Sequence, residues 1–216
     1  MRTKLLLLVL LVYSISAISQ SVETKYFKES WGKEVKEKKA NYKKVISTYD
    51  DGVVKSKTYH IKNNRLVYVD EYKDDLPTGI WQEYDKKGNL ISERNFDSLV
   101  YVDISKIKKD SLPMDTTNYI HATYGSAGDR LNYLQSNIKY PQEAKESGIQ
   151  GTIYMTFTIS KEGDIKDVKI LRGVHPFLDY EAYRVIKNMG KWNPATKDGV
   201  AVESVYNMPL RFILAG

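Results

Sequence analysis

The last third of the chain, residues 140–214, most constrains what the protein can fold into, because its apolar pattern changes period twice. Residues 151–159 alternate apolar and polar side chains, which predicts a half-buried strand. The polar, glycine-bearing turn over 160–164 then predicts a hairpin partner over 165–172. From Pro176 onward apolar residues recur at helical spacing, and a final run from Val202 to Leu214 alternates again. The pattern predicts one small α+β domain.

The order of elements also predicts the topology of this domain. A hairpin followed by a crossing helix brings the third strand beside the first, so we expect a three-stranded antiparallel sheet in the spatial order 2-1-3. Two helices should cover one face: the long one, and a shorter one over 130–137 capped by Asp129. The long helix is expected to leave its charged residues in solvent, namely Asp179, Glu181, Arg184 and Lys187.

Several short motifs in this region occur in a characteristic order. They are Tyr140-Pro141-Gln142-Glu143-Ala144, Val168-Lys169-Ile170-Leu171-Arg172-Gly173, Lys191-Trp192-Asn193-Pro194-Ala195 and Tyr206-Asn207-Met208-Pro209-Leu210-Arg211-Phe212. Together they run in register through about 75 residues and resemble the TonB C-terminal domain family. The resemblance implies that residues 129–216 bind the short periplasmic box of an outer-membrane transporter, which joins the sheet as an extra strand. The partner-binding residues carried over are Asn137, Lys139, Tyr140, Pro141, Val205, Asn207 and Arg211.

Pro209 supports the same geometry independently of the resemblance. Proline cannot donate to a sheet ladder, so the strand that holds it belongs at an edge or at a bulge. If this strand lies at the edge, Val205, Asn207, Pro209 and Arg211 turn their backbone groups outward, where an extended peptide can pair with them. The alternative is an edge covered by the linker or by the N-terminal region.

The N-terminal half has the rhythm of an antiparallel β-meander. Turn signals at residues 50–52, 63–64, 74–77 and 86–89 are spaced by roughly 12 residues. Residues 49–56 and 84–92 share a Tyr-Asp-turn-Gly-apolar-Ser order, which resembles MORN-like repeats over 20–97. The many tyrosines are expected to pack a thin sheet. Residues 98–128 lose periodicity and are interpreted as a linker with an extra strand at 99–104.

The N-terminus indicates export. A basic start, an apolar run over 5–12 and small residues up to Ser19 form the pattern of a signal peptide over 1–19. The apolar segment is shorter than the roughly 20 residues of a membrane span. We therefore expect a periplasmic protein; the alternative is an uncleaved anchor in the inner membrane. The chain has no cysteine, which excludes disulfides and thiolate metal sites.

No convergent catalytic set is visible, so the protein is not expected to be an enzyme or to need a cofactor or metal. The histidines, His60, His121 and His175, lack second ligands at metal spacing. A net charge of +6, without a tight basic patch, makes nucleic acid an unexpected partner. The short apolar segment and the linker's single proline also depart from a full energy transducer, so force transmission is not expected to follow from binding.

Two hypotheses of function remain. In the first, a periplasmic TonB-family protein binds a TonB-box-like peptide of an outer-membrane transporter by strand addition, in TonB-dependent transport; inner-membrane motor proteins or self-association are further partners. In the second, a structural envelope protein uses its repeat sheet for interaction, and its C-terminal domain dimerises through the same edge strand.

Overall fold

The computed structural model describes residues 21–104 and 117–214. The expected signal peptide, its cleavage point and part of the expected linker lie outside these residues. Within the described part of the chain, no helix is both long enough and apolar enough to cross a membrane.

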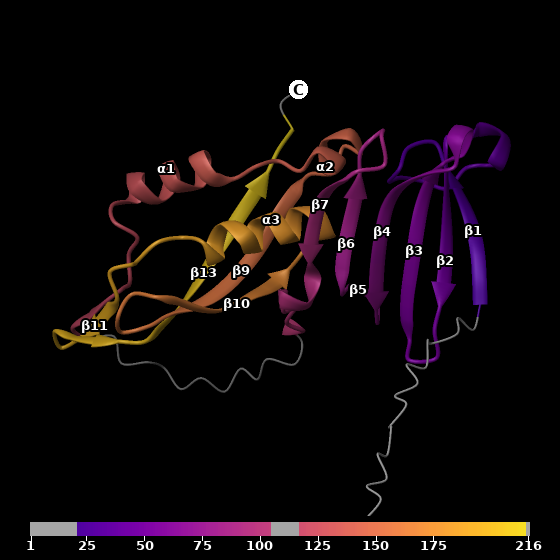
Figure 1. Cartoon of the computed structure of the whole chain (residues 1–216). Coiled ribbons are helices and arrows are strands. Elements are labelled where there is room, and N and C mark those ends of the chain that lie inside the picture. Colours follow the sequence, from indigo (N-terminus) through magenta and orange to yellow (C-terminus); the bar gives the residue numbers. More distant parts are fainter. Residues whose placement is uncertain (1–20, 105–116, 215–216) are drawn as a thin grey trace, which may run out of the picture.

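The N-terminal half is an antiparallel sheet in the order β1-β2-β3-β4-β6-β7, with β5 paired to β4 (Figure 1). Its strands are β1 (Ser21–Phe27), β2 (Tyr42–Thr48), β3 (Val53–His60), β4 (Arg65–Lys73), β5 (Leu76–Pro77), β6 (Ile80–Tyr84) and β7 (Leu90–Asn95). All four predicted turns connect consecutive strands, and Asn64, Asp74 and Asp75 take positive φ there. The antiparallel meander is confirmed, whereas the likeness to MORN repeats stays a prediction.

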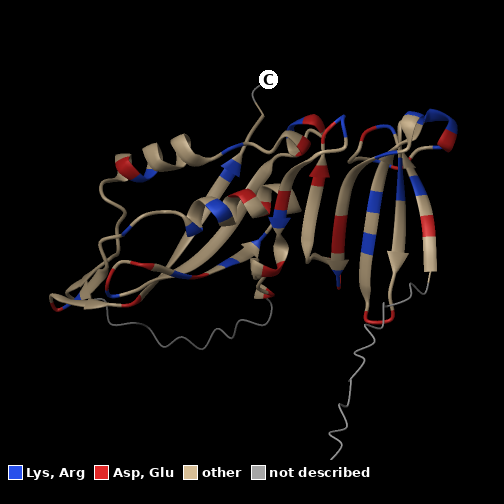
Figure 2. Cartoon of the chain, viewed as in Figure 1, with Lys and Arg blue, Asp and Glu red and all other residues tan. Residues whose placement is uncertain are grey.

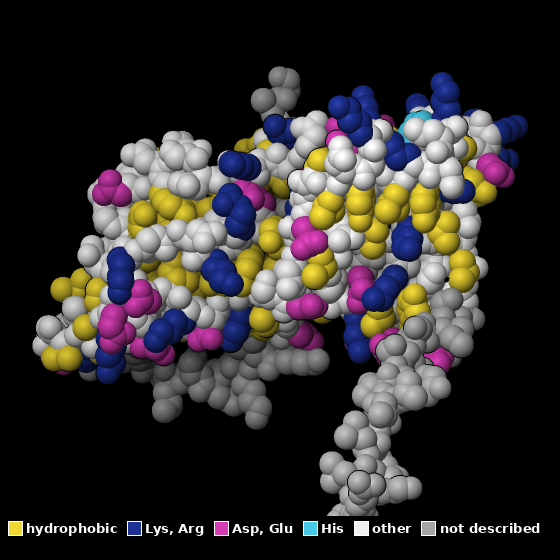
Figure 3. Space-filling model, viewed as in Figure 1, with side chains coloured by type: hydrophobic (Ala, Val, Ile, Leu, Met, Phe, Trp, Pro, Cys, Tyr) yellow, Lys and Arg dark blue, Asp and Glu magenta, His cyan; other side chains and the backbone are white. Residues whose placement is uncertain are grey.

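Three short 3-10 helices accompany this sheet: η1 (Glu37–Lys39), η2 (Ile61–Asn63) and η3 (Phe96–Ser98). The lysine-rich η1 buries none of its residues, which is usual for a run of charged residues at the surface. Figure 3 shows hydrophobic side chains gathered in a band across the visible face of the β1–β7 sheet.

The C-terminal sheet consists of β9 (Gly151–Ile159), β10 (Ile165–Arg172) and β13 (Ser204–Phe212) in the order β10-β9-β13. The predicted order 2-1-3 is therefore confirmed. The helix α3 (Pro176–Lys187) lies across one face of this sheet (Figure 1). The helix α1 (Ala127–Asn137) packs on the same side, because Arg130 donates to the hydroxyl of Tyr206 and Tyr133 donates to the carbonyl of Val185.

The start of α1 differs from the prediction. The helix begins at Ala127, and Ser126 is its N-cap, accepting from the backbone N–H of Asp129. Asp129 accepts in return from the N–H of Ser126, which completes a capping box. The sequence analysis took Asp129, which occupies the N3 position of this box, for the cap itself. A third helix, α2 (Gln142–Glu146), follows the Tyr140-Pro141 motif.

A small third sheet, in the order β12-β11-β8, was not predicted. It joins β8 (Tyr119–Ile120) to the hairpin of β11 (Ala195–Lys197) and β12 (Val200–Val202). Val202 therefore belongs to this hairpin, and β13 begins only at Ser204. The strand β8 comes from the stretch interpreted as a linker.

The extra strand expected at 99–104 is a single parallel bridge between Tyr101 and Ile170 of β10. The N–H of Val102 donates to the carbonyl of Ile170, and the N–H of Ile170 donates to the carbonyl of Val100. The outer edge of β10 is thus occupied at this point. This contact ties the end of the N-terminal half to the C-terminal sheet.

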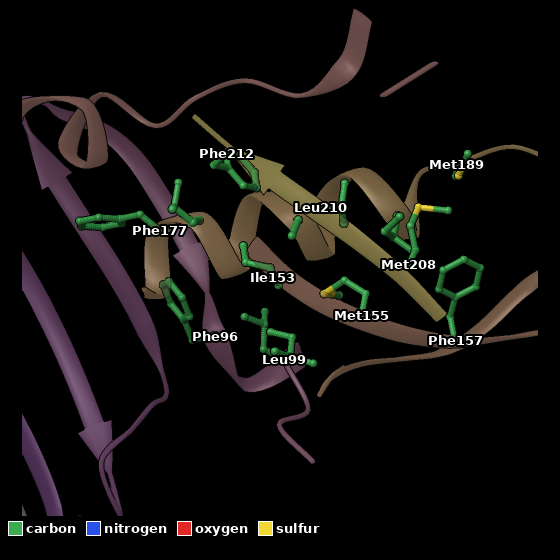
Figure 4. Close-up of a cluster of buried hydrophobic side chains, with 14 of the residues drawn as sticks. Phe96, Leu99, Ile153, Met155, Phe157, Phe177, Met189, Met208, Leu210 and Phe212 are labelled. Atoms are coloured by element: carbon green, nitrogen blue, oxygen red, sulfur yellow. The ribbon is translucent and has the colours of Figure 1, made fainter. Parts of the chain in front are cut away.

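The core of the C-terminal domain lies between α3 and the inner faces of β9 and β13 (Figure 4). The predicted apolar side of the helix is confirmed, since Leu178, Ala182, Val185, Ile186 and Met189 are buried. The expectation that Asp179 and Glu181 face solvent is wrong, because both are buried. Asp179 accepts from the backbone N–H groups of Val174 and His175 and from the hydroxyl of Tyr101.

The two halves share a continuous core through an aromatic cluster. Trp31 stacks on Trp81 of β6, with ring centroids 5.8 Å apart, and meets Phe177 of α3 edge-on at 4.9 Å. The ammonium of Lys44 lies 4.2 Å from the Trp31 ring. The first turn of α3 is therefore packed against the N-terminal sheet as well as against its own.

Candidate functional site: a free strand edge

The candidate site is the outer edge of β13. In the described part of the chain this strand pairs only with β9, through nine consecutive residue pairs from Ser204–Ile159 to Phe212–Gly151 without a register shift. Its side chains alternate: Met208, Leu210 and Phe212 are buried, while Val205 is 70% exposed. This alternation fixes the register of β13 on β9. Because β13 pairs on one side, one row of its backbone groups has no neighbouring strand in the described part of the chain.

Pro209 indicates which row of backbone groups points outward. Proline has no N–H, so a proline facing β9 would interrupt the ladder at Tyr154. The pairing runs through this position without a bulge or shift, which agrees with an outward-facing Pro209. Residues of the same parity, Val205, Asn207 and Arg211, then also turn their N–H and C=O groups outward.

These three predicted site residues lie together on β13, and the side chain of each is exposed. Their cross-strand partners on β9 are threonines: Thr158 beside Val205, Thr156 beside Asn207 and Thr152 beside Arg211. Because paired residues point to the same face, these side chains share the face opposite α3. The face of the sheet opposite α3, called the open face below, therefore meets the outward edge along β13.

The other four predicted site residues are held mainly by α3 and the core; they are Asn137, Lys139, Tyr140 and Pro141. A guanidinium nitrogen of Arg184, Nη2, donates to the carbonyl of Asn137 at 2.7 Å. The buried carboxylate of Glu181 accepts from the N–H of Lys139 at 2.6 Å and from two nitrogens of Arg184. The hydrogen bond to Glu181 is the main reason that the pKa of Arg184 is raised.

Tyr140 is the member of this group that the fold brings to β13. Its ring meets Phe212 edge-on, with centroids 5.6 Å apart, and its hydroxyl donates to the carbonyl of Ile149. Burial raises the pKa of Tyr140. Pro141 N-caps α2. Tyr140 thus supports the end of the edge strand from inside, whereas the three β13 residues face the solvent.

A groove adjoins the start of the edge strand and was missed by sequence reasoning. Its volume is about 610 Å³. Its lining residues are Tyr119, His121, Lys197, Val202, Glu203, Ser204 and Val205. The small sheet forms one wall, and the beginning of β13 forms the other. A strand as short as β8 leaves no periodic signal, so this wall could not be read from the pattern.

The arrangement at β13 can bind an extended partner through its outward backbone groups. In residues 21–104 and 117–214 no group of three His, Cys, Asp or Glu side chains is placed to hold a metal ion.

The comparison with known proteins concerns the C-terminal part of the chain. No curated protein and no solved structure matches the chain. The family model for the Gram-negative bacterial TonB protein C-terminal matches residues 136–214, which include α2, α3, β9, β10 and β13. The match supports placing this C-terminal part of the chain in the TonB C-terminal family.

Proposed function

We infer that the protein works in the cell envelope as a TonB-family binding protein that captures an extended peptide of an outer-membrane transporter. The peptide would pair with the outward row of β13 as a fourth strand of the C-terminal sheet. The observation that carries this proposal is the edge position of β13, with its unshifted ladder to β9 and its exposed outer residues. The family match of residues 136–214 supports the same role.

Because the peptide would be bound mainly through its backbone, the site would accept many peptide sequences and would show only a weak preference for particular side chains. Backbone hydrogen bonds supply most of the affinity in strand addition, and alternate side chains supply specificity. About five such bonds at about 0.5–1.5 kcal/mol each, less the cost of ordering the peptide, correspond to roughly micromolar binding. The groove beside Val205 would receive a side chain at one end of the peptide.

An NMR titration of the full chain with transporter box peptides tests the proposal. The amide signals of β13 should shift most, and the signals of β10, whose outer edge already meets residues 100–102, should shift least. A control peptide with N-methyl groups on alternate amides should not bind. Unmoved β13 amides at millimolar peptide would contradict the proposal.

A single substitution separates backbone recognition from side-chain recognition. Asn207→Pro removes one outward N–H without touching the buried side chains, so the peptide affinity should fall by about tenfold, the equivalent of one lost hydrogen bond. Asn207→Ala keeps the N–H and is the matched control, expected to bind within about twofold of the wild type. Equal losses in both variants would show that the Asn207 side chain, and not the backbone, makes the contact.

The second hypothesis, dimerisation through the same edge, predicts a different result. Light scattering would then report a stable dimer at micromolar concentration, and β13 amides would be protected from exchange in the absence of any peptide. A monomer with exchanging β13 amides favours peptide capture. We place the protein in the periplasm, with an uncleaved inner-membrane anchor as the alternative; sequencing of the mature N-terminus decides between them.

A further inference from the structure

The open face of the C-terminal sheet, opposite α3, carries basic residues from β10. On β10 the basic residues Lys166, Lys169 and Arg172 recur every third position, a spacing that would scatter them over both faces of a regular strand. Two register shifts change this outcome. One lies between Lys166 and Lys169, and the other between Ile170 and Arg172.

Each shift inserts one extra residue into β10 and so restores the alternation. Lys166 pairs with Thr158, Lys169 with Thr156 and Arg172 with Tyr154, and all three β9 partners alternate with buried residues of the opposite face. The basic side chains therefore form a single column on the open face, at intervals of about 7 Å along the strand. Bulges commonly re-aim side chains in this way, and Asp167 at the first one takes a positive φ.

Other residues of the open face are also cationic or polar. Arg211 on β13 adds a fourth cation, and Thr152, Thr156 and Thr158 lie between the two outer strands. Tyr154, 44% exposed, stands between Arg172 and Pro209. The face thus combines long cationic side chains, short hydroxyl side chains and an exposed aromatic ring. Figure 2 shows Lys and Arg along β10.

Among the described residues of these strands and of the β9–β10 turn, the acidic side chains lie at one end of this surface. Glu162, in the turn before β10, lies near Lys166, and Asp167 lies at the first bulge. Asp164 is engaged by Lys191 at 2.9 Å. The far end, with Lys169, Arg172 and Arg211, has no acidic residue among its cross-strand partners. In the described part of the chain, the strands of this face therefore carry positive charge, which is concentrated away from the β9–β10 turn.

We propose that this open face, defined by Lys166, Lys169, Arg172, Arg211 and Tyr154, docks on an anionic phospholipid surface. The proposal does not depend on peptide capture, since three of its four cations lie on β10, two strands away from the outer edge of β13. Docking in this orientation would hold the free edge of β13 parallel to the membrane.

The chemistry of the face favours lipid over an acidic protein. Lysine and arginine extend beyond the short threonines, so their charged ends reach a headgroup layer while the sheet remains outside it. Tyrosine is enriched at membrane–water interfaces, and here it is exposed in the centre of the cations. Each cation near an anionic surface adds a modest, salt-sensitive attraction, so the contact would be reversible.

Sedimentation of the purified full chain with vesicles tests the proposal. The chain should bind vesicles of equal parts phosphatidylglycerol and phosphatidylcholine, should not bind pure phosphatidylcholine, and should be released by high salt. The triple variant Lys166→Gln, Lys169→Gln, Arg172→Gln should lose about 100-fold in partition constant. Each single variant should lose about fivefold, which keeps the test valid if the triple variant folds poorly.

The matched control changes the same charge elsewhere. Lys36, Lys38 and Lys39 are exposed beside or within η1, and their triple change to Gln also removes three positive charges. This control should bind anionic vesicles nearly as well as the wild type. Absence of vesicle binding, or equal loss in both triple variants, overturns the proposal. Binding to polyglutamate without binding to vesicles would also overturn it, in favour of an acidic protein partner.

Discussion

At the residue scale, the junction of the two halves holds two half-buried titratable groups, Glu83 and His175, whose pKa values are shifted in opposite directions. Glu83 of β6 accepts from the hydroxyl of Tyr68, and Arg94 contacts Glu143 of α2 at 2.8 Å. Burial, together with repulsion from Glu143, raises the pKa of Glu83 to about 7. His175, the N-cap of α3, is half-buried, and this partial burial lowers its pKa to about 4.

These shifts oppose each other in the pH dependence of stability. Folded Glu83 keeps its proton to higher pH than the unfolded chain does, so its contribution to the free energy of unfolding is lost as pH rises from about 4.5 to about 7. Folded His175 resists protonation, so its contribution is lost as pH falls from about 6.5 to about 4. The wild type should therefore show a shallow profile between these limits.

Substitution of Glu83 should expose the histidine's effect. Glu83→Gln keeps the shape of the side chain but no longer titrates, so the free energy of unfolding should rise steadily with pH up to about 6.5, by on the order of 1 kcal/mol. Urea unfolding at a series of pH values measures this. His175→Asn retains a capping acceptor and should give the reverse slope. If the two variants gave the same dependence of the free energy of unfolding on pH, Glu83 and His175 would not act in opposite directions.

At the element scale, the turn between β9 and β10 depends on the close approach of Gly163 to the backbone of Trp192. Gly163 has φ of +84°, and a Cβ there would lie 2.1 Å from the carbonyl oxygen of Trp192. The N–H of Trp192 donates to the carbonyl of Gly163, so this turn and the loop after α3 are joined through the backbone. The hairpin and the route into the small sheet therefore share this contact.

Gly163→Ala should destabilise the protein by more than about 2 kcal/mol, because the strain of a positive φ is added to a clash with backbone that cannot yield. Gly88→Ala is the matched control: its φ is +88° and its Cβ would meet nothing within 4 Å. The control should cost only about 1 kcal/mol. Thermal unfolding of both variants checks this, and equal costs would show that the close approach to Trp192 is unimportant.

At the scale of the whole molecule, Trp31 joins the two sheets. It comes from the loop after β1 and contacts Trp81 and Tyr68 of the N-terminal sheet and Phe177 of α3. Its backbone carbonyl also accepts from the hydroxyl of Ser147, which follows α2. The N-terminal sheet is thus held against the side of the C-terminal domain next to α2 and the first turn of α3.

Trp31→Ala should cost about 3–5 kcal/mol and should loosen the junction of the two sheets. Trp192→Ala is the comparison, since Trp192 is equally enclosed but packs within the C-terminal domain against Phe157 and Tyr206. Hydrogen exchange should report faster exchange in β6 and at the start of α3 for the first variant, and in β9 and β13 for the second. The same exchange pattern in both would mean that Trp31 does not join the halves.

Much of the C-terminal fold could be predicted from sequence because its signals are local and periodic. The alternation over 151–159, the hairpin turn and the helical stripe after Pro176 all lead to the observed elements and to the order β10-β9-β13. The four turns of the N-terminal sheet could also be predicted from the sequence, since Asn, Asp and Gly are the residues that most readily take a positive φ. The outward row of β13 follows from the chemistry of Pro209.

The failures of sequence reasoning have a common cause. Asp179 and Glu181 were expected in solvent because they are charged, but each also accepts a hydrogen bond from a distant segment, from the hydroxyl of Tyr101 and from the backbone N–H of Lys139 respectively, which helps to make their burial possible. The strand β8, the groove beside Val205 and the shared aromatic core arise likewise from segments far apart in the chain.

Local pattern by itself therefore determined the long strands and helices of the C-terminal domain and limited the strand of Pro209 to an edge or a bulge, because side-chain period and proline chemistry act within a few residues. Only the tertiary structure decided what lies beside that edge and that Lys166, Lys169 and Arg172 share one face, because bulges and long-range pairing leave no periodic trace in the sequence.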